Sequence, residues 1–545
     1  MLRLIFAWSL VNGLLLAPQW IYPVEGQSVG WFALEAPLLV GLLAVLPKRR
    51  WSLGLTSAVS LLLIVTTLIL LVDTGFLASL GRPFNLFLDL YLVDAVKNLM
   101  VGNIGVPKSI GVLCGIILVF GLITWGLTRL LAPADDKTPH LARRLSGVAL
   151  IALFALGIDQ GAKLSFVGSR IDRPVVRLAR EQAEQLRLTR AERHNFAAEL
   201  ASAPDSYAGT PGLLSKLRNQ DVLLTFIEAY GVSAYEDPQW KVVMRPKFDE
   251  MASRLAAEGL YVATGKLLSS TQGGQSWYAH GTVVSGLWLN TQLRYDLLMA
   301  SERETMVDDF RRAGYSTAAV MPAITTQWPE GERLGYDQVY TAANIDYQGP
   351  PLYWVTMPDQ FTMSFLQKTV RPRADGKPLF AETALVSSHI PWTPIVPMLA
   401  WDSIGNGSVF APLEAEGAPP GELFDPDQLR VDYPRSLAYS LDATIGFAEQ
   451  YVDDETLYIV LGDHQPVPWV TGEDVTRHVP IHVITRDKEL LEPFLAWGFS
   501  PGTYPSPTQP EHRMDEFRSW FVHAFSDPSV VEHEAAHDST HAVAQ

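Results

Sequence analysis

The stretch that decides the fold is ETLYIVLGDHQP, residues Glu455–Pro466. An apolar run rich in β-formers ends there in a Gly-Asp-His turn, which is typical of a buried strand that breaks into a loop. Similar apolar runs are DVLLTFIEAYG (Asp221–Gly231), LFAETALVSSH (Leu379–His389) and VPIHVIT (Val479–Thr485). Segments with helical spacing lie between them, such as KFDEMASRLAAE (247–258). This alternation predicts an α/β domain with a mostly parallel sheet and helices on both faces.

The N-terminal part of the chain is apolar enough to form a membrane domain. A helix needs about 20 mostly apolar residues to cross a hydrocarbon core of roughly 30 Å. Helices of a soluble bundle would show a polar face, whereas Ser60–Val72 has no charged residue at all. We therefore predict a transmembrane domain over residues 1–164 with about five helices, four being the alternative. The five stretches are Leu4–Tyr22, Trp31–Leu46, Trp51–Val72, Ile110–Leu131 and Leu145–Gly161.

Basic residues predict the orientation of these helices, because loops rich in lysine and arginine stay in the cytoplasm. The connection 73–108 has few basic residues and contains amphipathic segments, which we expect along the outer surface. The part of the chain after Gly161 is then extracytoplasmic, or periplasmic, and the chain is a multi-pass protein of the cytoplasmic (inner) membrane. The basic residues that decide this are Lys48, Arg49, Arg50, Arg129, Lys137, Arg143 and Arg144.

Charge is distributed unevenly over the 545 residues, of which only 18% are charged. The net charge is +6 up to Pro204 and −22 from Asp205 onward, which gives −16 in total. An acidic chain argues against a nucleic-acid partner, and a single cysteine, Cys114, excludes a disulfide scaffold. We predict a basic helical connector at 165–212, either solvated or lying on anionic headgroups, then an extracytoplasmic domain at 213–530 and a disordered tail at 531–545.

Chemically distinctive side chains stand where the predicted strands end. Glu228 ends one strand, Asp463 and His464 end another, and His389 ends a third, while Ser276 follows a Gly-Gly-Gln turn before a helical segment. Each alone could be an ordinary loop residue. Together they form a set of oxygen and imidazole ligands for Mn²⁺ or Zn²⁺, with Mg²⁺ as a further candidate. A serine oxygen as the fourth ligand would be activated, since a metal lowers the pKa of a bound hydroxyl.

These segments resemble the membrane-anchored, sulfatase-like transferases of the alkaline phosphatase superfamily. Members include lipoteichoic acid synthase, the phosphoglycerol transferases of periplasmic glucans and the lipid A phosphoethanolamine transferases. The resemblance covers the membrane anchor and the segment from Asp221 to about Phe525. It rests on the order of DVLLTFIEAYG, GGQSWYAHGTVVSG, FRRAGYSTAAVMP, LGYDQVY, SSHIPWTP, GDHQP and RHVPIHV.

The resemblance implies roles for individual residues. Glu228, Asp463 and His464 match the metal ligands, and Ser276 falls at the position of the nucleophile. His389 and His478 fall where the family places residues that contact the substrate phosphate. We interpret His482, further along the same predicted strand, as structural.

Two departures from the family affect the function we expect. The transferases more often use threonine as nucleophile, so Thr271 is the alternative to Ser276. The phosphoethanolamine enzymes typically carry disulfides outside the membrane, and this chain has no cysteine there; this favours phosphoglycerol-like or other headgroup chemistry. The sulfatase signature Cys/Ser-x-Pro-x-Arg is missing, because Trp277 and Tyr278 follow Ser276.

The expected function is metal-dependent transfer of a phospho-headgroup from a phospholipid to a glycan or lipid hydroxyl, through a covalent intermediate on Ser276. The transferred group would be phosphoglycerol-like or phosphoethanolamine-like. A membrane-anchored phosphodiesterase or phosphatase of the same fold is the alternative, because no motif identifies the acceptor. A non-catalytic sensor built on the same fold is a further hypothesis.

Overall fold

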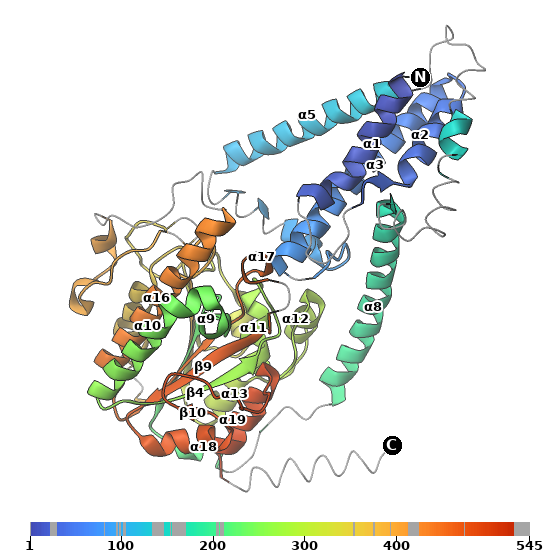
Figure 1. Ribbon diagram of the computed structural model, residues 1–545. Helices are drawn as coiled ribbons and strands as arrows, with labels where there is room; N and C mark the ends of the chain where they lie inside the picture. Colours follow the sequence, from blue (N-terminus) through green and yellow to red (C-terminus); the bar gives the residue numbers. More distant parts are fainter. Residues whose placement is uncertain are drawn as a thin grey trace. The chain divides into compact units, whose positions relative to one another are not determined.

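The computed structural model describes the chain in two compact units, Met1–Glu192 and Arg193–Gln545 (Figure 1). The described residues are 2–21, 30–80, 82–93, 96–97, 100–101, 105–132, 147–152, 154, 171–202, 207, 212–352, 355–373, 376–392, 394–411, 425–472 and 475–527. The predicted tail at 531–545 lies outside them.

Three helices of the first unit are long and apolar enough to cross a membrane: α1 (Leu2–Ile21), α3 (Arg50–Leu80) and α5 (Val106–Leu131). They confirm the first, third and fourth predicted stretches as apolar helices of spanning length. The second stretch is the shorter α2 (Glu35–Val45), which has 11 residues and is therefore only about 16 Å long. The fifth stretch lies mostly outside the described residues, so the count of five stays a prediction.

The rest of the described first unit contains a short strand pair, a 3-10 turn, an ion pair and a long polar helix. Strands β1 (Phe32–Ala33) and β2 (Ile171–Asp172) form a two-stranded parallel pair, and the 3-10 helix η1 (Asp89–Tyr91) lies in the connection after α3. Arg82 pairs with both carboxylate oxygens of Asp89 at 2.7 and 2.9 Å. Most of the predicted basic connector is helix α8 (Pro174–Ser202).

The second unit is built on an eight-stranded sheet in the order β10-β4-β9-β8-β3-β7-β5-β6. Strands β8, β3, β7, β5 and β6 pair in parallel, and β9, β4 and β10 continue the sheet with antiparallel pairings. The strand bounds are β3 (Asp221–Ile227), β4 (Tyr261–Leu268), β5 (Ser316–Met321), β6 (Gln338–Thr341), β7 (Leu379–Leu385), β8 (Thr456–Gly462), β9 (His478–Thr485) and β10 (Ser500–Pro501).

The sheet is therefore mixed, and the expectation of a mostly parallel sheet holds for only one side of it. The reason lies in the connection from β8 to β9. A parallel return needs a crossover, usually a full helix. In the described part of residues 463–477, the one-turn helix α17 (Pro468–Thr471) is the only helix. Strand β9 runs back beside β8 in the antiparallel sense.

Helices cover both faces of the sheet, as the sequence predicts. Successive side chains of a strand point to opposite faces, and the buried residues of β8 divide accordingly: Tyr458 and Val460 belong to one core cluster, whereas Leu457, Ile459 and Leu461 belong to the other. Helices α10 (Pro238–Ala257), α15 (Asp359–Phe365) and α16 (Pro426–Tyr451) contribute to the first cluster, while α11 (Ser276–Ser285), α13 (Met306–Arg312) and α19 (Phe517–Phe525) contribute to the second.

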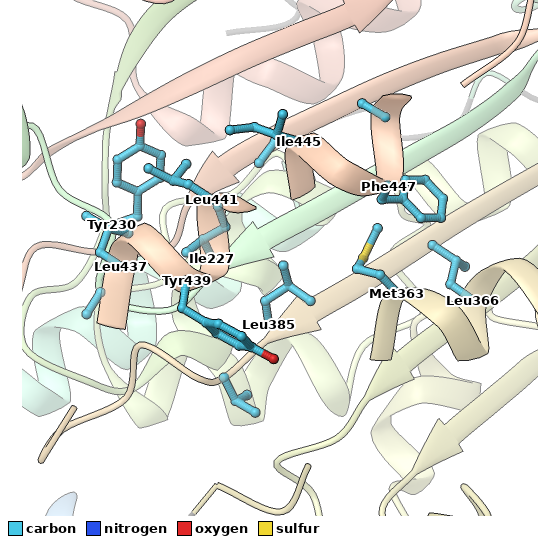
Figure 2. Close-up of a cluster of buried hydrophobic side chains, with 14 of the residues drawn as sticks. Ile227, Tyr230, Met363, Leu366, Leu385, Leu437, Tyr439, Leu441, Ile445 and Phe447 are labelled. Carbon is cyan, nitrogen blue, oxygen red and sulfur yellow. The ribbon is translucent and has the colours of Figure 1, made fainter. Parts of the chain in front are cut away.

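Figure 2 shows part of the first cluster, where side chains of α16 such as Leu441 and Ile445 meet those of the strand ends, including Ile227 and Leu385. Because β3 and β7 are buried on both faces, their loops are held at fixed positions at the sheet edge. The other short helices are α9 (Ser233–Glu236), α12 (Gln292–Met299), α14 (Pro329–Arg333) and α18 (Glu492–Ala496), with 3-10 turns η2 (Ser215–Leu217), η4 (Trp401–Ser403), η5 (Ser408–Phe410), η6 (Lys488–Leu491) and η7 (Met514–Glu516) and the π-helical turn η3 (Leu366–Val370).

His482 is a fully buried histidine in the middle of β9. Its Nδ1 lies 2.8 Å from the Thr264 hydroxyl and its Nε2 lies 2.8 Å from the Tyr230 hydroxyl. Burial lowers the pKa of His482 to about 3, so the imidazole is neutral in the folded protein. Its place in the sheet is that of a structural residue.

We expect His482 to make the protein less stable in acid. The unfolded chain binds a proton at this residue below about pH 6.5, whereas the folded chain does so only near pH 3. This group alone should therefore lower the free energy of unfolding by about 1.4 kcal/mol per pH unit across that window. Denaturant unfolding of the full chain in detergent between pH 7 and 4 measures the slope. His482→Gln should reduce it; an unchanged slope would show that another group is responsible.

Candidate active site

The two strands at the centre of the sheet bring three potential metal ligands together. Strands β3 and β8 are parallel neighbours, and Ile227 pairs with Gly462 at their carboxyl ends. Glu228 follows the first strand, and Asp463 and His464 follow the second. One ligand atom from each lies within 4.8 Å of the others. The His464 Nε2 atom lies 3.3 Å from Glu228 Oε1 and 3.7 Å from Asp463 Oδ2.

Hydrogen bonds from the backbone fix the orientation of these side chains. Asp463 Oδ1 accepts from the backbone amides of Ala229, at 2.8 Å, and His464, at 2.6 Å. His464 Nδ1 lies 2.8 Å from the Gln465 carbonyl, which leaves Nε2 directed at the carboxylates. Such outer contacts set the geometry and tautomer of metal ligands.

Glycine is required next to the cluster. A Cβ atom on Gly462 would lie 1.8 Å from the Tyr230 carbonyl oxygen. The two strand ends therefore approach more closely than any side chain at position 462 would permit. This explains the glycine of the Gly-Asp-His turn by backbone packing.

The electrostatics of the cluster are those of a cation site. Burial and the Glu228 carboxylate raise the pKa of Asp463 to about 6. Burial acts to lower the pKa of His464, but the carboxylates of Asp463 and Glu228 outweigh it and raise that pKa to about 9. For Glu228, burial is outweighed by the charge and hydrogen bond of His464, so its pKa lies below the usual value. Two carboxylates and an imidazole so placed fit a divalent cation such as Mn²⁺ or Zn²⁺.

Ser276 lies against this cluster at the first residue of α11. Its hydroxyl donates to Glu228 Oε2 at 3.0 Å and lies 3.2 Å from His464 Nε2. The preceding residues Gly273, Gly274 and Gln275 all have positive φ angles, and this turn places the helix start at the cluster. The alternative nucleophile Thr271 instead donates to the Gly274 carbonyl within the same loop.

A pocket of about 260 Å³ opens beside Ser276. His389 lines it, with its Nδ1 lying 2.6 Å from the Ile390 carbonyl. The walls are largely apolar and aromatic. They include Phe226, Trp277, Val284, Tyr295, Met321, Ile324, Trp328 and Leu334.

His478 is not among the residues that line this pocket. It is the first residue of β9 and pairs with Leu268 of β4. Its Nδ1 contacts the Thr476 hydroxyl, and its Nε2 lies 3.7 Å from Glu511. Burial lowers its pKa. The role in phosphate contact that the resemblance implies for His478 stays a prediction.

Sequence reasoning missed three polar residues of the site. His280 and Glu382 both line the pocket, and Tyr336 donates to Glu382 from behind it. Two signals were available: His280 follows Ser276 by one helical turn, and Glu382 is the only charged residue within β7.

Comparisons with solved structures find matches at low identity. The lipoteichoic acid synthase LtaP from Listeria monocytogenes matches with a TM-score of 0.37 and 12% identity, over 61% of this chain and 80% of that one. The phosphoglycerol transferase GacH from Streptococcus pyogenes matches at 0.36 and 13%, over 63% and 82%. The periplasmic domain of EptC from Escherichia coli, in complex with Zn, matches at 0.35 and 12%, over 55% and 80%. No protein-family model and no curated protein matches the chain.

We expect the affinity of the cluster for Mn²⁺ or Zn²⁺ to depend on pH. A metal ligand must be deprotonated, and His464 holds its proton up to about pH 9 in the metal-free protein. The affinity should therefore rise from pH 7 to 9, with proton release on binding. Titration calorimetry of the full chain in buffers of different ionisation enthalpy measures both.

Asp463→Asn is the variant for this measurement. Loss of the Asp463 charge should weaken metal binding by more than about 100-fold. Changes to residues that only support a metal ligand already lower metal affinity 10–100-fold. The matched control is Asp442→Asn, since Asp442 is bonded to Lys247 and Arg254 away from the cluster. Equal affinities in the two variants would contradict the assignment of the site.

Proposed function

We propose that this protein is a membrane-anchored, sulfatase-like phosphotransferase. It transfers a phospho-headgroup, phosphoglycerol-like or phosphoethanolamine-like, from a phospholipid to a glycan or lipid hydroxyl outside the cytoplasmic membrane. The observation that carries the proposal is the position of the Ser276 hydroxyl. It lies 3.0 Å from Glu228 and 3.2 Å from His464 at a helix start, where a pocket opens.

The mechanism begins with attack of Ser276 Oγ on the phosphorus of the donor. A metal ion held by Glu228, Asp463 and His464 would lower the pKa of the serine hydroxyl and offset the phosphate charge when bound. Phosphate binding at the start of α11 is favoured by the backbone amides and the helix dipole. We assign to His389 a contact with a non-bridging oxygen, since it lines the same pocket.

The reaction proceeds in two displacements. In the first, the bond from phosphorus to Ser276 Oγ forms and the bond to the lipid oxygen breaks, which leaves a phosphoserine diester. In the second, an acceptor hydroxyl oxygen bonds to phosphorus and Ser276 is released. Splitting one transfer into two steps is the usual advantage of covalent catalysis.

The anchor supports a lipid donor. Helices α1, α3 and α5 are each long and apolar enough to span the bilayer, and the basic residues Lys48, Arg49 and Arg50 favour an extracytoplasmic catalytic unit. An enzyme tethered in this way works at the surface where phospholipid headgroups are concentrated. The same catalytic unit without its membrane helices would lose this proximity to the headgroups.

The decisive variant is Ser276→Ala. We expect it to lose more than about 10³-fold of the metal-dependent release of diacylglycerol from labelled phospholipid, and to lose the covalent adduct. Mass spectrometry of the trapped wild-type chain measures the adduct, and its mass identifies the transferred group. Products formed with and without a candidate glycan distinguish transfer from hydrolysis.

Thr271→Val is the matched control for this experiment. Because the Thr271 hydroxyl is bonded within its own loop, this variant should still form the adduct on Ser276. An adduct found on Thr271, or unchanged turnover in Ser276→Ala, would overturn the assignment of the nucleophile.

A further inference from the structure

A second polar group lies in the pocket beside the metal cluster. His280 is four residues beyond Ser276 on α11, so the two side chains occupy the same helix face about one turn apart. Both line the pocket. His280 is therefore within reach of a phosphodiester that Ser276 attacks.

Two contacts hold the His280 ring in place. Its Nδ1 lies 2.6 Å from Glu382 Oε1 of β7, and that carboxylate is 1% exposed. Phe226 of β3 stacks on the imidazole with ring centroids 3.8 Å apart and an angle of 25°. The other oxygen of Glu382 accepts from the Tyr336 hydroxyl. The ring orientation is thus set by side chains of two strands, and Tyr336 holds one of them.

The contacts leave one nitrogen of His280 available. Glu382 occupies Nδ1, and among the described residues no hydrogen bond is made to Nε2. A carboxylate at Nδ1 fixes the tautomer of the neutral imidazole, with its hydrogen on Nδ1. In catalytic triads, a carboxylate orients a histidine that acts as acid or base. Glu382 is placed relative to His280 in the same way.

Stability alone is a poor explanation for the pair. Replacing a buried ion pair by apolar side chains is often neutral or stabilising, and the wall around it is already apolar. The other carboxylates and imidazoles that line the pocket are Glu228 and Asp463, which belong to the cluster, and His389, whose Nδ1 lies 2.6 Å from the Ile390 carbonyl. Within the described residues, no lysine or arginine lines the pocket.

We propose that His280 is the proton donor and acceptor of the transfer reaction, with Glu382 and Tyr336 as its positioning residues. The proposal rests on the proposed function of Ser276. In the first displacement, Nε2–H of the His280 imidazolium gives its proton to the lipid oxygen as the bond from that oxygen to phosphorus breaks. In the second, the neutral Nε2 takes the proton of the acceptor hydroxyl as its oxygen bonds to phosphorus. Ser276 would enter the cycle deprotonated, after losing its hydroxyl proton once to solvent, and it would leave in the same state, so the protons balance over the cycle.

The test compares two leaving groups in the full-length protein in detergent. The lipid probes are dihexanoyl phosphatidylglycerol and dihexanoyl phosphatidylethanolamine, which release an alkyl alcohol that needs a proton. The second probe is methyl p-nitrophenyl phosphate, which releases a stable phenolate that needs none. A proton donor therefore matters only for the lipids.

We expect His280→Gln to lose about 10²–10⁴-fold of kcat on the lipid, the range of general acid–base catalysis. On the aryl diester it should keep formation of the Ser276 adduct within about fivefold of wild type, since a donor that is not used contributes nothing there. Glu382→Gln should show the same selective loss, to a smaller extent. The wild type should show a solvent isotope effect with the lipid and a smaller one with the aryl diester.

The matched control is His512→Gln. His512 is also a partly buried histidine beside a glutamate, with Nδ1 lying 3.5 Å from Glu516 and a side chain that is 15% exposed against 13% for His280. It does not line the pocket, so this variant should behave as wild type on both probes. His389→Gln should lose activity on both probes, because a phosphate contact serves either leaving group.

Equal loss on the two probes in His280→Gln, or no loss on the lipid, would overturn the proposal. If that variant does not fold, equal solvent isotope effects of the wild type on the two probes would overturn it as well. A wild type that forms no Ser276 adduct with any probe would instead overturn the proposed function, and this proposal with it.

Discussion

The side chain of Asp463 joins the ends of the two central strands, and the candidate site depends on this contact. One carboxylate oxygen accepts from the amide of Ala229 beyond β3 and from the amide of His464 beyond β8. The other oxygen is left for the cluster. Because the same residue both joins the two strand ends and is a candidate ligand, the geometry of the cluster follows from strand pairing in the buried sheet.

Helix α11 adds the reacting groups to this frame. Its first residue lies at the cluster, and its second turn carries His280 to the Glu382 carboxylate of β7. One short helix therefore positions both the proposed nucleophile and a histidine, and it is held against the sheet by buried side chains such as Val283. Three carboxylates, those of Glu228, Glu382 and Asp463, line the pocket. Binding of the proposed phosphate would therefore need a cation that offsets their negative charge.

Sequence patterns predicted those parts of the molecule that depend on local order. Glu228, Asp463 and His464 could be found because apolar runs mark strands, and the ends of parallel neighbours meet at one edge. The antiparallel part of the sheet could not be predicted. The direction of β9 depends on whether the β8–β9 connection contains a crossover helix, and the strand patterns do not show this. The pair His280 and Glu382 was missed because it joins a helix and a strand 102 residues apart. The length of α2 was also not predicted, because the apolar run from Trp31 to Leu46 extends beyond the residues that are helical.

The close approach at Gly462 has a consequence for how related chains should be interpreted. The requirement there is for space between two backbones, and it is independent of which metal or which headgroup is used. A homologue that keeps all three ligands but carries a larger residue at this position would have its strand ends forced apart and its ligands misplaced. In a set of related sequences, that single position would separate working enzymes from inactive descendants, even where every chemically reactive residue is intact.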